Sequence, residues 1–339
     1  MTHRRPSWAI GLLLAMVLVA SLATACSEAD PAPSPASLPA TPAAPAAPAA
    51  PAELPTARTE VAGARWVGRI VVVGGLTEAG VASDRVDIYD PSSNRWEAGP
   101  PLPIGLHHVG LATLGDRIYL AGGYHNPRPA AAWEPQSRVL SLGPGERAWR
   151  EEAPLSAARG GLALVELGDR LVAVGGTGAC SDGILRRTEV LVPGEGGGWR
   201  AGPDLAAPRD HLAAASVKGR VVAIAGRQGS LESNLASVES WSPGAEEGWR
   251  PEPALNDTRG GTSAADPSGR PCVAGGEEPQ GTIASVECLV GGRWERVATL
   301  RVPRHGLAVV ALGTRLHVIG GGPQPGLTVS PAHEVFDIA

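Results

Sequence analysis

The sequence predicts an all-β protein built from short, repeated strands. Its 339 residues include 45 Gly and 32 Pro, and beyond residue 30 these interrupt almost every run long enough for a helix. Glycine pairs end short apolar runs at regular intervals, and tryptophans recur between the pairs. The 43% apolar content supports a sizeable core. An α/β architecture with regular crossover helices is therefore disfavoured.

The glycine pairs and the tryptophans keep one fixed register. The pairs stand at Gly74-Gly75, Gly122-Gly123, Gly175-Gly176, Gly275-Gly276 and Gly320-Gly321, with Ala225-Gly226 as a degenerate sixth. The position 26 residues before a pair is occupied by Trp96, Trp149, Trp199, Trp249 and Trp294. A Leu follows each Trp by six residues, and an Arg usually follows four residues later. Coincidences in fixed register indicate an internal repeat.

Each repeat divides into four short strands. The clearest first and second strands are Gly110–Leu114 and Arg117–Ala121, joined by a tight turn of the kind found in hairpins. The third strand is typified by Val86–Tyr89, and the fourth begins at Trp96. Four antiparallel strands repeated six times predict a six-bladed β-propeller over residues 54–339.

These residues resemble kelch repeats, such as those of the galactose oxidase central domain. The resemblance rests on the glycine pair, an aromatic residue in the third strand (Tyr89, Trp241) and the downstream Trp, and it covers residues 54–339. It implies that the first strand of every blade is innermost. We interpret the glycine pair and the Trp as scaffold residues, which allow close backbone approach and fill space between blades.

Closure of the ring is the weak point of this fold. The last repeat stops in a third-strand-like segment, Glu334–Ile338, with no Trp after it. A fourth strand would have to come from residues 44–54, where Pro45, Pro48 and Pro51 remove ladder hydrogen bonds. We therefore expect six blades with an incomplete or weakly closed last blade.

The first fifty residues have the composition of a targeting signal followed by a spacer. Residues 1–25 combine a basic start with the apolar run Ala9–Ala20, as in a secretory signal, although a membrane anchor is the alternative. The following Cys26 gives a resemblance to bacterial lipoprotein signals. This implies lipidation of Cys26 and a location at the cell envelope, with membrane contact through the lipid only. Residues 26–53 form an Ala/Pro-rich tether.

The loops between second and third strands should share one face with the segments that lead into each first strand. These loops vary most in length, which is typical of a binding face. Five arginines begin the first strands and predict a ring at the channel mouth: Arg58, Arg159, Arg209, Arg259 and Arg304. Four histidines follow the same position: His107, His108, His211 and His305.

Two interpretations of the arginines remain open. They either bond carbonyls or carboxylates of neighbouring blades, or capture an acidic peptide or an anionic sugar. The resemblance supports the second, because kelch substrate adaptors of ubiquitin ligases use arginines at this position for acidic peptides.

Two enzymatic interpretations also follow from the resemblance. A galactose oxidase-like copper site needs two Tyr, and Tyr124 is the only loop Tyr near His107 and His108. The second is a bacterial N-acetylneuraminate epimerase, an exported kelch propeller that uses Arg and Glu. Glu277-Glu278 could form an acid/base set with Arg209 and Arg259, or could be solvated loop carboxylates.

Cysteines and charge add further limits. Cys272 and Cys288 lie on the second and third strands of one blade and could form a disulfide in an exported protein, although two buried thiols are the simpler expectation. Cys180 has no evident partner. The sequence shows no metal-ligand spacing, phosphate loop or nucleophile elbow, so we expect no metal or cofactor. A net charge of −5 argues against nucleic acid.

The sequence thus predicts an envelope-anchored, non-catalytic module that binds a protein or carbohydrate, and this ligand is acidic if the arginines capture it. The alternative is an exported sugar-modifying enzyme similar to N-acetylneuraminate epimerase. The shape of the channel mouth distinguishes them. A deep pocket with convergent Arg and Glu indicates the enzyme, whereas a broad, shallow rim indicates a binding surface.

Overall fold

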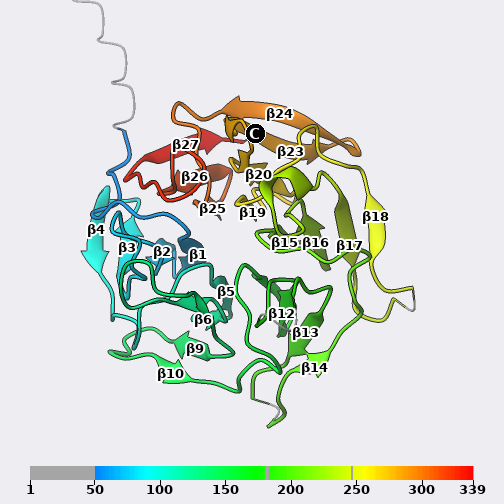
Figure 1. Cartoon of the computed structure of the whole chain (residues 1–339), viewed down its shortest axis with the longest axis horizontal. Helices are drawn as coiled ribbons and strands as arrows, with labels where there is room; N and C mark the ends of the chain where they lie inside the picture. Colours follow the sequence, from blue (N-terminus) through cyan, green and yellow to red (C-terminus); the bar gives the residue numbers. More distant parts are fainter. Residues whose placement is uncertain (1–49, 180–182, 195, 246, 339) are drawn as a thin grey trace, which may run out of the picture. The chain divides into compact units, whose positions relative to one another are not determined.

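Six antiparallel sheets form a ring around a central channel in the computed structural model (Figure 1). The structure describes residues 50–179, 183–194, 196–245 and 247–338. The signal segment, Cys26, Cys180 and most of the tether lie outside these residues. Within them, no helix has the length and apolarity to cross a membrane.

The first three blades follow the expected strand pattern. Blade 1 contains β1 (Ala62–Trp66), β2 (Arg69–Val73), β3 (Val86–Asp90) and β4 (Arg95–Ala98). Blade 2 contains β5 (Gly110–Leu114), β6 (Arg117–Ala121), β9 (Val139–Leu142) and β10 (Arg150–Glu151), and a small hairpin, β7 (Tyr124–His125) with β8 (Glu134–Pro135), rises from its loop. Blade 3 contains β11 (Ala163–Leu167), β12 (Arg170–Val174), β13 (Thr188–Leu191) and β14 (Arg200–Ala201).

The remaining blades differ mainly at the end. Blade 4 contains β15 (Ala213–Val217), β16 (Arg220–Ile224), β17 (Val238–Trp241) and β18 (Arg250–Glu252), with the 3-10 turn η1 (Leu231–Ser233) in its loop. Blade 5 contains β19 (Ser263–Ala265), β20 (Cys272–Ala274), β23 (Ser285–Val290) and β24 (Arg293–Thr299), with the hairpin β21 (Glu277–Glu278) and β22 (Gly281–Thr282). Blade 6 has three described strands, β25 (Ala308–Leu312), β26 (Arg315–Ile319) and β27 (His333–Asp337).

The core lies between the blades rather than inside a single layer. The second strands are the most buried, because each has sheet neighbours on both sides and a blade packed on both faces. Six apolar clusters result, one between each pair of adjacent blades. The prediction of an all-β, six-bladed propeller with innermost first strands is therefore confirmed (Figure 1).

The repeated tryptophans hold neighbouring blades together, as predicted. Each indole Nε1 donates a hydrogen bond of 2.9 Å to a backbone carbonyl two residues before a repeat Leu. These carbonyls belong to Ala52, Pro100, Ala153, Pro203 and Pro253. The Trp therefore combines apolar packing at the seam with a directional bond to the preceding repeat.

Residues 50–54 close the ring without forming a fourth strand. The Leu54 amide donates to the carbonyl of Pro331 at 2.9 Å, and Leu54 is buried between blades 6 and 1. Trp96 and His333 both contact the carbonyl of Ala52. The last blade is thus incomplete, as expected. Residues 50–53, however, belong to the propeller rather than to the tether, because side chains of blade 1 bind their backbone.

Candidate functional site

The five repeated arginines are buried ion-pair partners. All five have no exposed surface. Each pairs with the second or third residue of its own blade's third strand, namely Asp87, Glu189, Glu239, Glu287 and Glu334. Arg209 Nη2, for example, lies 2.5 Å from Glu239 Oε1, and Arg159 Nη2 lies 2.7 Å from Glu189 Oε2.

This placement corrects the expectation that Arg58, Arg159, Arg209, Arg259 and Arg304 ring the channel mouth. Their guanidinium groups also donate to backbone carbonyls at the ends of second strands, as Arg58 does to Gly74 at 2.7 Å and Arg209 to Ala225 at 2.9 Å. A ligand in the channel cannot reach a side chain without exposed surface. The arginines therefore hold the third strand to the segment before the first strand.

Blade 2 supports this structural role. It carries Leu106 where the other blades carry Arg, and Leu140 where they carry the acid. Both leucines are fully buried in the cluster between blades 1 and 2. The two partners of the ion pair are thus replaced together by an apolar pair. Such replacement is tolerated when neither charge is left alone.

Two residues beyond the arginine position, the chain forms a second ring that faces the channel. Its members are Glu60, His108, Gly161, His211, Gly261 and Gly306, one from each blade. The amide of each residue from His108 to Gly306 donates to the carbonyl of the preceding member, at 2.7–3.2 Å. The Val61 amide closes the ring by donating to Gly306 at 3.2 Å. This inner ring fixes the six blades at the top of the channel.

The backbone of the inner ring favours glycine. All six members have positive φ, between 48° and 65°. Three of them are Gly, for which this conformation costs little. The other three are Glu60, His108 and His211, and a non-glycine residue there stores strain that is commonly found at functional sites.

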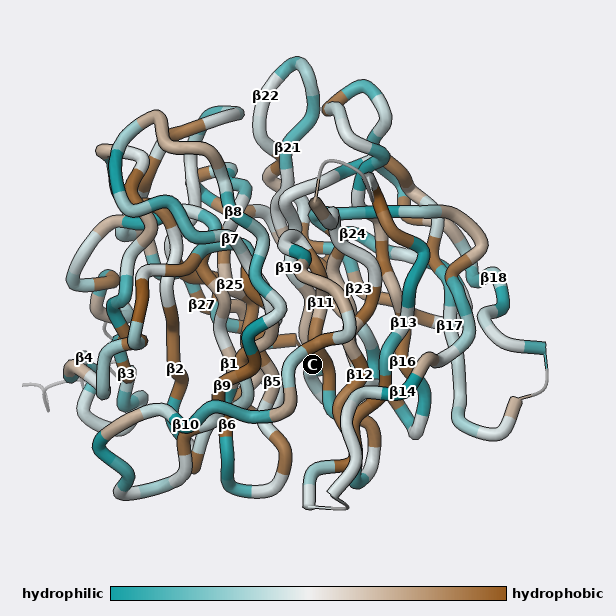
Figure 2. Tube along the Cα trace, turned by 60° about the horizontal axis from the view of Figure 1, so that its bottom comes forward, coloured by the Kyte–Doolittle hydropathy of each residue, from teal (hydrophilic) through white to brown (hydrophobic). Residues whose placement is uncertain are grey.

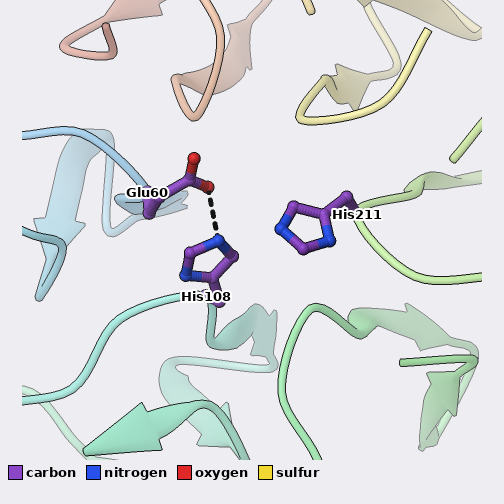
Figure 3. Close-up of side chains that lie close together, drawn as sticks. All are labelled: Glu60, His108 and His211. Carbon is purple, nitrogen blue, oxygen red and sulfur yellow. Dashed lines mark ion pairs between the residues drawn. The ribbon is translucent and has the colours of Figure 1, made fainter. Parts of the chain in front are cut away.

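These three strained residues converge on one another (Figure 3). His108 Nε2 lies 3.1 Å from Glu60 Oε2, and one potential ligand atom from each of the three residues falls within 4.8 Å of the others. The rings of His108 and His211 pack edge to face, with centroids 4.7 Å apart. His305 adds a fourth member, since its Nδ1 lies 3.1 Å from Glu60 Oε1.

Burial and charge set the protonation states of this group. Burial lowers the pKa of His108 well below its ordinary value, so that its imidazole is neutral at pH 7. Burial opposes ionisation of Glu60, but the imidazoles of His108 and His305 outweigh it and hold the pKa of Glu60 far below its usual range. Burial likewise disfavours charged His305, yet its bond to Glu60 and the charge of Glu277 raise its pKa overall.

A cavity of about 350 Å³ opens above this group. Its walls come only from the segments before first strands and from the loops between second and third strands. These loops, including the β7–β8 and β21–β22 hairpins, lie on the same side of the propeller (Figure 2). The prediction of a shared loop face is therefore confirmed, and the face contains a pocket rather than a shallow rim.

An arginine and a glutamate meet in this cavity. Arg227 Nη1 donates to Glu277 Oε1 at 2.8 Å, and Arg227 Nε lies 3.6 Å from Asp210 Oδ1. Glu277 Oε2 in turn lies 3.6 Å from His305 Nδ1. Glu277 is therefore a cavity residue, as the sequence suggested, but its arginine partner is Arg227 and not Arg209 or Arg259.

The predicted histidines do not all have the same position. His108, His211 and His305 line the cavity, whereas His107 is fully buried behind them. Burial lowers the pKa of His107 to about 4. His107 packs against the ring of Trp133, with centroids 4.6 Å apart, and Trp133 forms part of the cavity wall.

Sequence reasoning missed Glu60, Arg227 and Trp133. The repeat register contains a signal for Glu60. Three of the six inner-ring positions are Gly, and Glu60 is the acidic exception among them. Arg227 directly follows the degenerate Ala225-Gly226 pair, as Glu277 follows Gly275-Gly276. Trp133 lies in a loop of unique length, so no repeat register marks it.

Cys272 and Cys288 form a disulfide, contrary to the expectation of two thiols. They are directly opposite each other in the register of β20 and β23, with Cα atoms 4.0 Å apart, and both are fully buried. The bond joins the second and third strands of blade 5.

Comparison with known proteins agrees with this architecture. The kelch motif matches residues 58–103, which contain most of blade 1. Kelch-like protein 35 of Mus musculus is 32% identical over 104 residues, 31% of this chain and 16% of that protein. Kelch-like protein 34 of Homo sapiens is 35% identical over 116 residues, 32% of this chain and 17% of that protein. The chain thus spans less than a fifth of the length of these relatives.

A solved structure extends the likeness to the whole propeller. The structure of YjhT superposes with a TM-score of 0.72 and covers 84% of this chain and 95% of that chain, at 14% identity. Identity this low shows a shared fold. The chain therefore has the six-bladed β-propeller fold, with a kelch motif in its first blade.

Proposed function

We propose that this protein is an enzyme that interconverts the anomers of an acidic sugar such as N-acetylneuraminate, within the cavity above the inner ring. The observation that carries the proposal is the ion pair between Arg227 and Glu277 in a pocket on the loop face. This arrangement favours the enzymatic alternative over the non-catalytic binding module, for which a broad, shallow rim was expected.

The size and lining of the cavity suit a monosaccharide. About 350 Å³ lies at the small end of ligand pockets. The wall also carries the polar side chains of Asn126, Arg227 and Glu277. The indole of Trp133, 46% exposed, offers an apolar face for a sugar ring.

The charged residues have complementary roles in this proposal. The planar guanidinium of Arg227 suits the sugar carboxylate and would exchange part of its contact with Glu277 for the ligand. Glu277 would accept the proton of the anomeric hydroxyl while the bond between the anomeric carbon and the ring oxygen breaks. The same carboxyl then returns the proton to the ring oxygen. Rotation of the open keto form and reversal of these steps give the other anomer.

The location of the enzyme is a separate proposal. The lipoprotein-like signal supports export and lipidation at Cys26, with the tether holding the propeller away from a membrane. Labelling of the cells with an alkyne fatty acid should mark the protein, and Cys26→Ser should remove the label. An unlabelled wild-type protein in the envelope fraction would contradict lipid anchoring.

The enzymatic proposal is tested by NMR of freshly dissolved N-acetylneuraminate. The protein should accelerate the approach to anomeric equilibrium, and Glu277→Gln should reduce the rate constant at least 100-fold. Glu278→Gln is the matched control, because Glu278 is the next residue and does not line the cavity; it should keep the activity within about 3-fold. Saturable binding of the sugar without acceleration would contradict the enzyme and support a binding module.

A further inference from the structure

We propose that Glu60, His108 and His211 form a binding site for one divalent transition-metal ion, with zinc as the best fit. This site goes beyond the proposed sugar chemistry and does not depend on it. Two imidazoles and one carboxylate are a recurrent ligand set for zinc, with the fourth position left to water or a substrate oxygen.

The three ligand atoms are already gathered. Ligands held at about 2.0–2.1 Å from a tetrahedral zinc ion stand roughly 3.3 Å apart. Here one pair, His108 Nε2 and Glu60 Oε2, is 3.1 Å apart, and all three ligand atoms lie within 4.8 Å of one another. Small rotations of the side chains would complete the geometry. Figure 3 shows the His211 ring turning one nitrogen toward Glu60 and His108.

Each ligand has a neighbour that orients it. His211 Nδ1 lies 2.9 Å from Asp210 Oδ1, which leaves Nε2 as the atom available to a metal. His108 Nδ1 forms a hydrogen bond with His107 Nδ1, so that Nε2 of His108 is likewise the atom available to a metal. The second oxygen of Glu60 faces His305 Nδ1 at 3.1 Å. Outer partners of this kind fix the tautomer and orientation of metal ligands.

His211 gives an independent sign of a missing partner. Its side chain is 8% exposed, and its Nε2 is buried without a hydrogen-bond partner among the residues that the structure describes. A buried imidazole nitrogen in this state needs an explanation, and a metal ion would supply one.

The backbone of the three ligands adds to the argument. Glu60, His108 and His211 occupy inner-ring positions where the remaining blades have Gly with the same positive φ. Glycine would relieve the strain at each position, yet the three non-glycine residues are the ones that converge. Strain concentrated in converging, metal-ligating side chains points to a site.

The charges around the site also favour a cation. The carboxylates of Glu60, Asp210 and Glu277 lie around the group, and Arg227 pairs with Asp210 and Glu277. A divalent ion bound by Glu60, His108 and His211 would place positive charge beside these three carboxylates. The ion would be reached through the same cavity, since Glu60, His108 and His211 all line it.

Titration of the metal-free, untagged protein with Co²⁺ and with Zn²⁺ tests this site. One equivalent of Co²⁺ should produce the visible bands of a low-symmetry, four- or five-coordinate complex, and Zn²⁺ should displace it. His211→Gly should weaken binding at least 100-fold while preserving the fold, because glycine occupies the equivalent position in three blades. Asp210→Asn should weaken binding about 10- to 100-fold.

His125→Ala is the matched control, because His125 lies in the adjacent β7 strand outside the three ligands, and it should bind metal as the wild type does. The site is refuted if wild-type protein binds no metal or if His211→Gly and Glu60→Gln bind it unchanged. Since the readout is metal binding alone, a negative result leaves the anomer-interconversion proposal untouched, and the NMR assay can fail while metal still binds.

Discussion

The arginine ring and the inner ring lie two residues apart along the chain but have opposite relations to their surroundings. Arginines such as Arg159 and Arg259 form an ion pair with a carboxylate of their own blade and have no exposed surface. Glu60, His108 and His211 instead converge from three blades and face a cavity.

The arginines therefore stabilise the fold, whereas the converging inner-ring residues are placed where they can contact a ligand. An ion pair inside one blade is repeated in five blades and can be replaced as a unit, as Leu106 and Leu140 show. A cluster that spans blades occurs once and keeps a strained backbone. Repetition therefore marks the scaffold here, and departure from the repeat marks the site.

The largest expected effect comes from breaking one buried ion pair. Arg159→Leu leaves Glu189 buried and unpaired, so the free energy of unfolding should fall by about 3–5 kcal/mol. Denaturant unfolding followed by tryptophan fluorescence measures the change.

The control gives blade 3 the leucine pair that blade 2 carries at the equivalent positions. The double variant with Arg159→Leu and Glu189→Leu should recover at least half of the lost free energy of unfolding. The rest is not recovered, because the Ser156 amide loses the hydrogen bond that it donates to Glu189. A double variant as unstable as the single one would show that the leucine pair of blade 2 is not an equivalent solution.

A smaller effect is expected from the histidines at the seam of the ring. His317 Nδ1 and His333 Nε2 are 2.9 Å apart, and His333 Nδ1 donates to the Ala52 carbonyl. Burial lowers the pKa of both to about 4. The unfolded chain therefore binds the proton first, and stability is lost as pH falls from about 6.5 toward 4.

Between pH 7 and pH 5 the proton that the unfolded chain takes up at each of the two histidines should reduce the free energy of unfolding by about 2 kcal/mol. Thermal unfolding at several pH values measures it. His333→Gln keeps a donor for Ala52 and should flatten the dependence. An identical pH dependence in wild type and variant would exclude the seam histidines as its source.

The smallest effect on stability should come from the inner ring itself. His211→Gly removes a side chain but relieves positive φ, so the free energy of unfolding should change by about 1 kcal/mol or less. The reverse change, Gly161→His, should lower it by about 1–2 kcal/mol. Calorimetry of the two variants tests this, and a strong destabilisation by His211→Gly would assign that residue to the scaffold.

The sequence predicted the scaffold well because the scaffold repeats. Gly110–Leu114 and Arg117–Ala121 are strands at the expected bounds, and Trp149 lies between blades 1 and 2. The arginines were found for the same reason. Bonding to carboxylates was one of the two interpretations of these arginines, but it assigned the partners to neighbouring blades, whereas each acid lies in the third strand of the same blade, for example 30 residues after Arg209.

The candidate site was only partly predictable. Glu60, His108 and His211 are 48 and 103 residues apart in succession, so no local ligand spacing exists. Only closure of the ring brings them together. Trp133 lies in a loop whose length is unique to blade 2, and the direction of Arg227 and Trp133 into the cavity follows from packing that a repeat pattern does not encode.

The central claim is that function resides in the cavity above the inner ring and not in the arginine ring. The most direct test compares Arg227→Met with the double variant Arg159→Leu and Glu189→Leu in the NMR assay of N-acetylneuraminate anomers. We predict at least a 100-fold loss of rate for Arg227→Met in protein that still folds, although with lower thermal stability because Asp210 and Glu277 lose their cationic partner, and a rate within about 3-fold of wild type for the folded double variant. Retained activity in Arg227→Met, or its loss in the folded double variant, would contradict the claim.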